Sequence, residues 1–139
     1  MTACLYVGMG GFIGSVLRYL VGLIPLKTTH GFPLLTLFIN ILGAFLIGFI
    51  STIALKKSMN PHLVLLLKTG LCGGFTTFST FALESITLHR NGNRTLAMIY
   101  IVLSIVLGLS AVILEGNTCG MKNTSCADQF AHALKEAIK

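Results

Sequence analysis

The sequence has few charged residues and no tryptophan. Only 10% of its 139 residues are charged, and only 4 are acidic, whereas 54% are hydrophobic and the mean hydropathy is +0.86. This composition is too apolar for an ordinary soluble domain. We therefore predict an integral membrane protein in contact with membrane lipid.

Cysteines are also few, and their spacing argues against two functions. Cys4, Cys72, Cys119 and Cys126 include no Cys-x-x-Cys pair, so a thiol oxidoreductase is poorly supported. Cys119 and Cys126 could form a disulfide or, with His132, contact a metal, but their spacing matches no common zinc site. We interpret Cys72 as a packing residue.

The positive charge is spread between apolar stretches rather than gathered in one stripe. A formal net charge of +6 would suggest nucleic acid as the partner of a soluble protein, but this distribution predicts none. Lys56 and Lys57 lie on the side shared with the N-terminus, and Lys27, Arg90 and Arg94 lie on the other. Because the two sides are nearly balanced, the sequence permits insertion in both orientations.

Apolar stretches long enough to cross a bilayer make up most of the chain, since a span needs about 20 residues. They run from Leu5 to Ile24, Leu34 to Leu55, Leu63 to Leu88 and Leu96 to Leu114. The first contains Arg18 rather than a cleavage site, so we interpret it as a span and not a signal peptide. The predicted fold is an all-α membrane domain of four helices over residues 1–115.

A polar tail of residues 116–139 follows the last apolar stretch. Ser125 and Asp128 resemble a helix-capping box, after which Phe130, Leu134 and Ile138 recur every four residues. We expect a short amphipathic helix that lies on the lipid headgroups, with partner binding as the alternative.

Glycines and hydroxyl residues are concentrated in the third apolar stretch, where residues 70–81 read GLCGGFTTFSTF. We predict that this helix is broken in mid-membrane. A break there needs protein or a wet cavity to satisfy the freed backbone groups, which is typical of an ion or substrate site. The alternative is a seam of small residues that only packs helices.

Polar residues on the second and fourth stretches share helix faces. Thr36 and Asn40 are four residues apart, as are Tyr100 and Ser104, so each pair lies on one face. Asn40 is either a hydrogen-bonding link between helices or a donor that lines a pore.

The candidate interior offers neutral donors, one arginine and one acid. Arg18 should point into an assembly or a vestibule, or else reach the membrane interface, and Glu84 should bond a neighbour. Such a lining suits an anion, and the positive ring edges of Phe78 and Phe81 are compatible with one. Two phenylalanines at this spacing are also common in an ordinary core.

These motifs resemble the Fluc/CrcB fluoride channel family. The resemblance rests on residues 10–19 (GGFIGSVLRY), residues 40–45 (NILGAF) and residues 70–81 together with Glu84. It implies a passive fluoride-selective channel that exports toxic fluoride across the cell's inner (plasma) membrane. It also implies an antiparallel, dual-topology homodimer with two pores and a central structural sodium ion, and no enzymatic activity.

The resemblance also implies roles for particular residues. The fluoride pore residues are Asn40, Phe78 and Phe81, with Thr36 as a supporting hydroxyl and a hydroxyl track of Ser79, Thr80, Tyr100 and Ser104. Arg18 matches a vestibule arginine. The backbone carbonyls of Gly73 and Thr76 match the sodium ligands.

Two other functions are compatible with a small four-span protein. A proton-coupled small multidrug exporter would need an acid in its first span and an aromatic cage, whereas this span has Arg18 and the chain has no tryptophan. A packing subunit of a larger complex would conduct no ions by itself. The partner is either an identical copy or an oppositely inserted paralogue.

Overall fold

The fold consists of long apolar helices, as the sequence predicts. The computed structural model describes residues 1–26, 28 and 31–113, and every regular element there is helical. It contains 4 helical spans that are long and apolar enough to cross a membrane: Thr2–Gly22, Leu34–Lys57, Pro61–Arg90 and Arg94–Ile113. The chain is therefore a multi-pass membrane protein by the length and composition of its helices.

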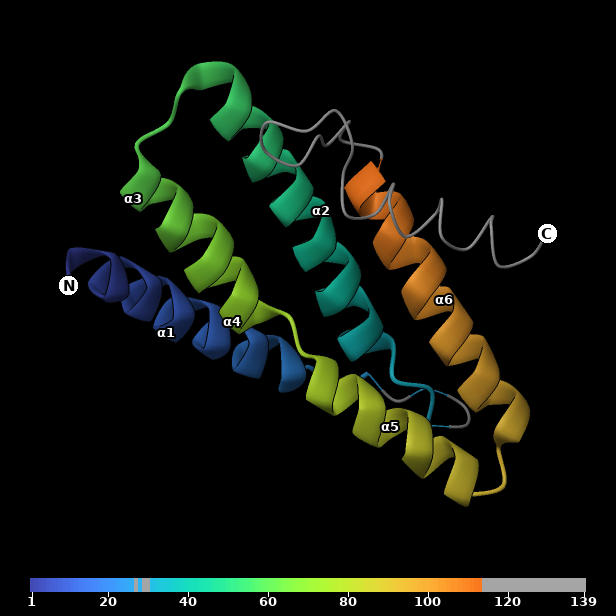
Figure 1. The fold of residues 1–139 in the computed structure, drawn as a ribbon. Helices are drawn as coiled ribbons and strands as arrows, with labels where there is room; N and C mark the ends of the chain where they lie inside the picture. The colour runs from blue at the N-terminus through green and yellow to red at the C-terminus, as the bar shows by residue number, and fades with distance from the viewer. Residues whose placement is uncertain (27, 29–30, 114–139) are drawn as a thin grey trace.

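The third span is made of several elements. It begins with α3 (Pro61–Val64), continues as the π-helix η1 (Leu65–Cys72) and α4 (Gly73–Phe75), and resumes after Thr76 and Thr77 as α5 (Phe78–Arg90). Thr76 and Thr77 both have extended backbone angles. Figure 1 shows the short non-helical connection between α4 and α5.

Side-chain caps explain where two of these elements begin. The Asn60 side chain accepts a hydrogen bond from the backbone N–H of His62 at 2.9 Å, which caps α3. The Thr77 hydroxyl accepts one from the backbone N–H of Thr80 at 3.3 Å, which caps α5. The chain can therefore leave the helix after α4 and re-enter it immediately.

The first helix, α1 (Thr2–Gly22), packs mainly against η1 and α4 (Figure 1). Glycines on both sides allow this contact, because a Cβ on Gly10 or Gly14 would overlap backbone atoms of η1, and one on Gly74 would overlap Gly11 O. The small residues of the first span thus form a packing face.

The remaining helices, α2 (Leu34–Lys57) and α6 (Arg94–Ile113), pack against each other, and α6 also packs against α5. A buried cluster of Leu37, Leu88, Ala97 and Tyr100 joins them, with Phe81 packed against its edge. The outer helix faces expose many large apolar side chains. Such a surface suits a bilayer or another membrane-embedded chain.

The structure tests some of the remaining sequence-based predictions, and others fall outside the residues that it describes. Cys72 is fully buried, which confirms its interpretation as a packing residue, whereas Cys4 is exposed. The tail with its amphipathic helix, the possible pairing of Cys119 with Cys126, and the position of Lys27 lie outside the described residues.

Candidate functional site

A groove of about 360 Å³ lies where α2, the α4–α5 connection and α6 meet. Its walls include Asn40 from α2, Phe78 and Phe81 from α5, and Ser104 from α6. Thr76 and Thr77 of the connection complete the polar side. The groove therefore brings together four residues that the sequence assigns to one pore.

Asn40 bonds both backbone groups of Thr77. Its Nδ2 donates to Thr77 O at 3.1 Å, and the backbone N–H of Thr77 donates to Asn40 Oδ1 at 2.8 Å. In a continuous helix the N–H and C=O of Thr77 would bond other backbone groups. The amide of Asn40 therefore replaces helical hydrogen bonds at the interruption. The second N–H of the Asn40 amide takes no part in this pairing.

Hydroxyl groups cluster at the start of α5. The Thr77 hydroxyl donates to the Thr80 hydroxyl at 2.9 Å and lies 3.4 Å from that of Ser79. Thr77 is buried, whereas Ser79 is exposed. The two track residues predicted on this helix therefore gather around a third hydroxyl that the prediction did not include.

Phe78 and Phe81 belong to a row of aromatic rings. Their ring centroids are 5.7 Å apart, and that of Phe81 is 5.3 Å from Tyr100. Phe81 packs against the buried cluster, but 80% of the Phe78 surface is exposed. The two phenylalanines thus differ. Phe81 packs against the core of the chain, whereas Phe78 contacts Phe81 and is otherwise largely exposed.

Ser104 presents a polar atom with no protein partner. Ser104 lines the groove, and its hydroxyl oxygen is buried and forms no hydrogen bond to any described residue. A buried hydroxyl without a partner is costly, so this one is an unused donor beside the groove.

Thr36 and Tyr100 form hydrogen bonds with Glu84 and do not line the groove. The Thr36 hydroxyl donates to Glu84 Oε1 and the Tyr100 hydroxyl donates to Glu84 Oε2, both at 2.8 Å. Thr36 and Tyr100 are buried. The carboxylate thus ties α2, α5 and α6 together, and it also lines a second cavity of about 640 Å³ beside the α1–α2 connection.

The carbonyls near the end of α4 have different partners. Cys72 O accepts from the backbone N–H and hydroxyl of Thr76, each at 3.0 Å, and Gly74 O accepts from Arg18 Nε at 3.1 Å. The carbonyls of Gly73 and Thr76 accept none of these bonds. Gly73 is also exposed, with open space where a Cβ would be.

The structure therefore divides the predicted site residues into three groups. The groove contains Asn40, Phe78, Phe81 and Ser104, with Thr80 and Ser79 beside it. Thr36 and Tyr100 surround Glu84. Arg18, Gly73 and Thr76 lie at the end of α4, where Thr76 also lines the groove. Thr77 is the residue that the prediction missed. Its position one residue before Phe78 and three before Thr80 is the pattern of a hydroxyl cap, which could have indicated it.

Comparison with known proteins places these features in one family. The family model described as CrcB-like protein, Camphor Resistance (CrcB), matches residues 5–116, which include the groove and every predicted site residue. The chain belongs to the CrcB family. The resemblance drawn from its motifs is thereby confirmed.

Individual relatives of this CrcB-family chain share about half of their residues with it. "Fluoride-specific ion channel FluC" of Chlorobium chlorochromatii is 49% identical over 111 residues, which cover 79% of this chain and 86% of that protein. The protein of the same name from Chlorobaculum tepidum is 50% identical over 114 residues, 81% of this chain and 90% of that protein. That from Ruminiclostridium cellulolyticum is 46% identical over 110 residues, 78% and 85% respectively.

Proposed function

We propose that this protein is a fluoride-selective channel that lets toxic intracellular fluoride leave passively across the plasma membrane, without catalysis. Its relatives are named as fluoride-specific channels, and the family does not favour the multidrug-exporter alternative. The observation that carries the proposal is that Asn40, Phe78, Phe81 and Ser104 line one groove.

A lining of this kind suits a small, strongly hydrated anion. Conduction needs binding that is favourable enough for entry and weak enough for exit. The remaining N–H of Asn40, the hydroxyl of Ser104 and the ring edges of the phenylalanines offer successive weak donors without a fixed positive charge. Thr77 holds the Asn40 amide in one orientation, so its free N–H need not reorient when the anion arrives.

We also propose that the channel is an antiparallel, dual-topology dimer. The exposed ring of Phe78 and the open groove beside it leave the conduction path without a wall on one side, which a second chain would supply. Balanced charges at the span ends allow either orientation. Accessibility tags in the loops at residues 58–60 and 91–93 test this: a homodimer predicts that each loop is labelled from both sides, whereas labelling from one side would require an oppositely inserted paralogue.

The carbonyls of Gly73 and Thr76 are suited to a structural sodium ion at the centre of that dimer. They are oxygen donors, which hard cations prefer, and they take no part in the hydrogen bonds that satisfy Cys72 and Gly74. When bound, sodium would neutralise the negative ends of these carbonyl dipoles. The neighbouring carbonyls of Gly74 and Thr77 are held by Arg18 and Asn40, independently of any ion.

Gly73→Ala tests the sodium proposal because the new methyl group meets nothing inside one chain. We expect unchanged helicity but a weaker dimer, measured by size-exclusion chromatography with light scattering at several sodium concentrations. Gly8→Ala is the matched control, since a Cβ there is equally unobstructed. A Gly73→Ala dimer that is as stable as the control at every sodium concentration would count against a cation site.

The proposed function is tested with purified protein in liposomes loaded with fluoride or chloride. We expect fluoride efflux on addition of an ionophore for the counter-ion, with little chloride efflux and no ethidium transport. Ethidium transport would favour the exporter instead. The absence of any flux from folded protein would favour the packing subunit.

A further inference from the structure

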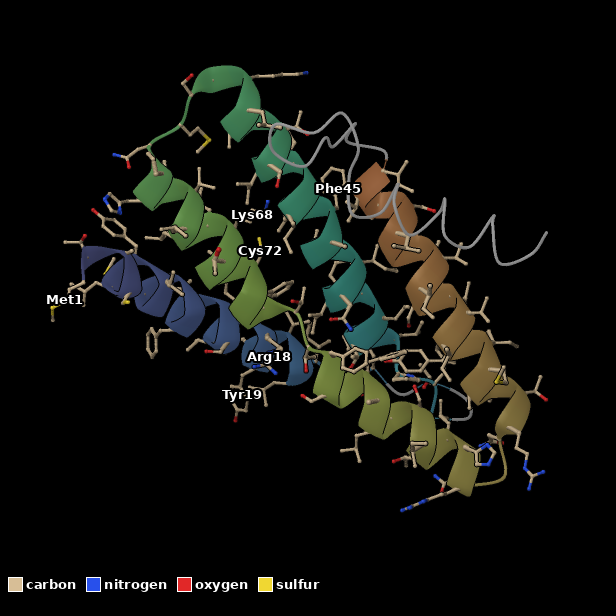
Figure 2. The ribbon with its side chains drawn as sticks, in the orientation of Figure 1. Met1, Arg18, Tyr19, Phe45, Lys68 and Cys72 are labelled. Atoms are coloured by element: carbon tan, nitrogen blue, oxygen red, sulfur yellow. The ribbon has the colours of Figure 1, made fainter. Side chains whose placement is uncertain are left out.

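Arg18 bonds the backbone at the end of α4. Its Nε donates to Gly74 O at 3.1 Å, and Figure 2 shows Arg18 on the part of α1 that passes the end of α4. Arg18 is half-buried and forms no ion pair with any residue that the structure describes. Its recorded interaction is therefore with a carbonyl rather than with an acid.

This carbonyl lacks its usual partner because the helix is interrupted. In a regular α-helix Gly74 O would accept from the N–H of Phe78, four residues later. Thr76 and Thr77 are extended, so that donor is displaced and the carbonyl needs another. An unpaired carbonyl is especially costly where lipid replaces water.

The approach of α1 makes the bond possible. Gly11 and Gly74 are in backbone contact, and Gly14 lies against Leu71 and Phe75, so the base of the Arg18 side chain is brought close to the end of α4. Asn40 performs the equivalent task from α2, three residues further along, on Thr77. The interruption is therefore held from two helices.

We propose that Arg18 is a positioning residue, which fixes the end of α4 through Gly74 O and so keeps Thr76 and Thr77 in the geometry that the groove needs. This differs from a vestibule role, in which the positive charge of Arg18 would attract the anion. The two roles depend on different parts of the side chain: positioning needs a donor at the Nε position, and attraction needs the charge.

Three substitutions of Arg18 separate these roles. Glutamine has its side-chain nitrogen at the same chain position as Nε of arginine, so Arg18→Gln keeps the donor and removes the charge. Arg18→Met places a methyl group at that position and removes both. Arg18→Lys keeps the charge but moves the nitrogen one bond further along the chain.

Cys72 provides a structural readout that does not depend on transport. It is fully buried, and its carbonyl bonds Thr76, so loosening of the interruption should expose its thiol. Replacing Cys4, Cys119 and Cys126 by serine leaves Cys72 as the only thiol. The rate of maleimide labelling in detergent then reports the order of this segment, while fluoride efflux from liposomes reports function.

Loss of the bond to this half-buried carbonyl predicts at least about tenfold faster labelling and about tenfold lower efflux for Arg18→Met. Arg18→Gln should remain within about threefold of the parent protein in both measurements, since only the weaker interaction of the charge with the helix end is lost. Efflux should therefore follow the order Arg, Gln, Lys, Met. Efflux that is higher for Lys than for Gln, with Cys72 protected in both, would overturn positioning and assign Arg18 to anion attraction.

The efflux arm rests on the proposed function, but the labelling arm does not. If the parent protein carries no fluoride, the proposed function fails, and the order of the labelling rates still tests the positioning role. If Arg18→Met does not fold, the comparison of Gln with Lys decides the question. Equal labelling rates for the parent protein, Gln and Lys variants, together with equal efflux, would overturn the proposal.

Discussion

The two halves of the molecule are held together by different forces. Between α1 and the η1–α4 segment, glycines let the backbones touch, and the Arg18 bond is the polar contact recorded there. Between α2, α5 and α6, a carboxylate with two hydroxyl donors and a row of aromatic rings make the contact. Because lipid removes most of the hydrophobic drive between helices, close packing and hydrogen bonds must supply the attraction. The α1 half relies more on close packing, and the half of α2, α5 and α6 relies more on side-chain hydrogen bonds.

The largest expected effect is on the glycine contact. Gly10→Ala places a methyl group against backbone atoms of Leu66, Gly70 and Leu71, which cannot turn away as a side chain could. We expect a loss of about 3 kcal/mol or more in stability, at the upper end for overpacking, or no folded protein at all. Thermal unfolding and recovery after size-exclusion chromatography measure it.

Gly8→Ala is the matched control for that substitution, since it lies on the same helix with no atom within 4 Å of the new methyl group. It should leave stability unchanged or raise it by up to about 1 kcal/mol, because alanine favours the helix. Equal behaviour of the two variants would refute the account of the α1 contact.

A smaller effect is expected in the polar half. Glu84→Leu leaves the buried hydroxyls of Thr36 and Tyr100 without their acceptor, which should cost about 2 kcal/mol. Combined with Tyr100→Phe, it should cost about 1 kcal/mol less than the sum of the two single changes, because both remove the same bond. Additive losses in a thermal-unfolding double-mutant cycle would mean that the carboxylate and the phenol do not interact.

Substitutions of the two phenylalanines should have the smallest effect on stability, and they separate packing within one chain from a role in conduction. Phe81→Ile should cost about 1 kcal/mol, since Phe81 packs against Tyr100 and the buried cluster. Phe78→Ile should leave stability nearly unchanged, since its ring is largely exposed within one chain. Both should lower fluoride efflux strongly, so a Phe78→Ile protein with normal efflux would remove that residue from the proposed pore.

Much of this architecture follows from local features of the sequence. The spans are predicted within a few residues because lipid imposes their length and apolarity, as with Leu5 to Ile24 against Thr2–Gly22. Gly10 and Gly14 form one packing face because residues four apart share one side of a helix. Both inferences use only neighbours along the chain.

Contacts between distant segments were not predictable in this way. Thr36 was expected to support Asn40, its neighbour on the same helix, but it donates to Glu84, 48 residues away. For Asn40 the sequence leaves a link between helices and a pore-lining donor open, and it does not identify the partner, which is the backbone of Thr77. Such partners depend on how α5 is placed against α2, which no spacing within either helix specifies. The sodium and dimer assignments remain predictions.

Fluoride efflux from liposomes that contain Asn40→Asp protein tests the central claim most directly. The substitution removes the amide donors and places a negative oxygen where Nδ2 lies 3.1 Å from Thr77 O, so it opposes both the anion and the backbone contact. Ser110→Ala, in a different groove, is the control and should conduct like the parent protein. The account predicts no efflux above protein-free liposomes from Asn40→Asp protein that unfolding and size-exclusion measurements show to be folded and dimeric. Efflux equal to that of the parent protein would contradict it.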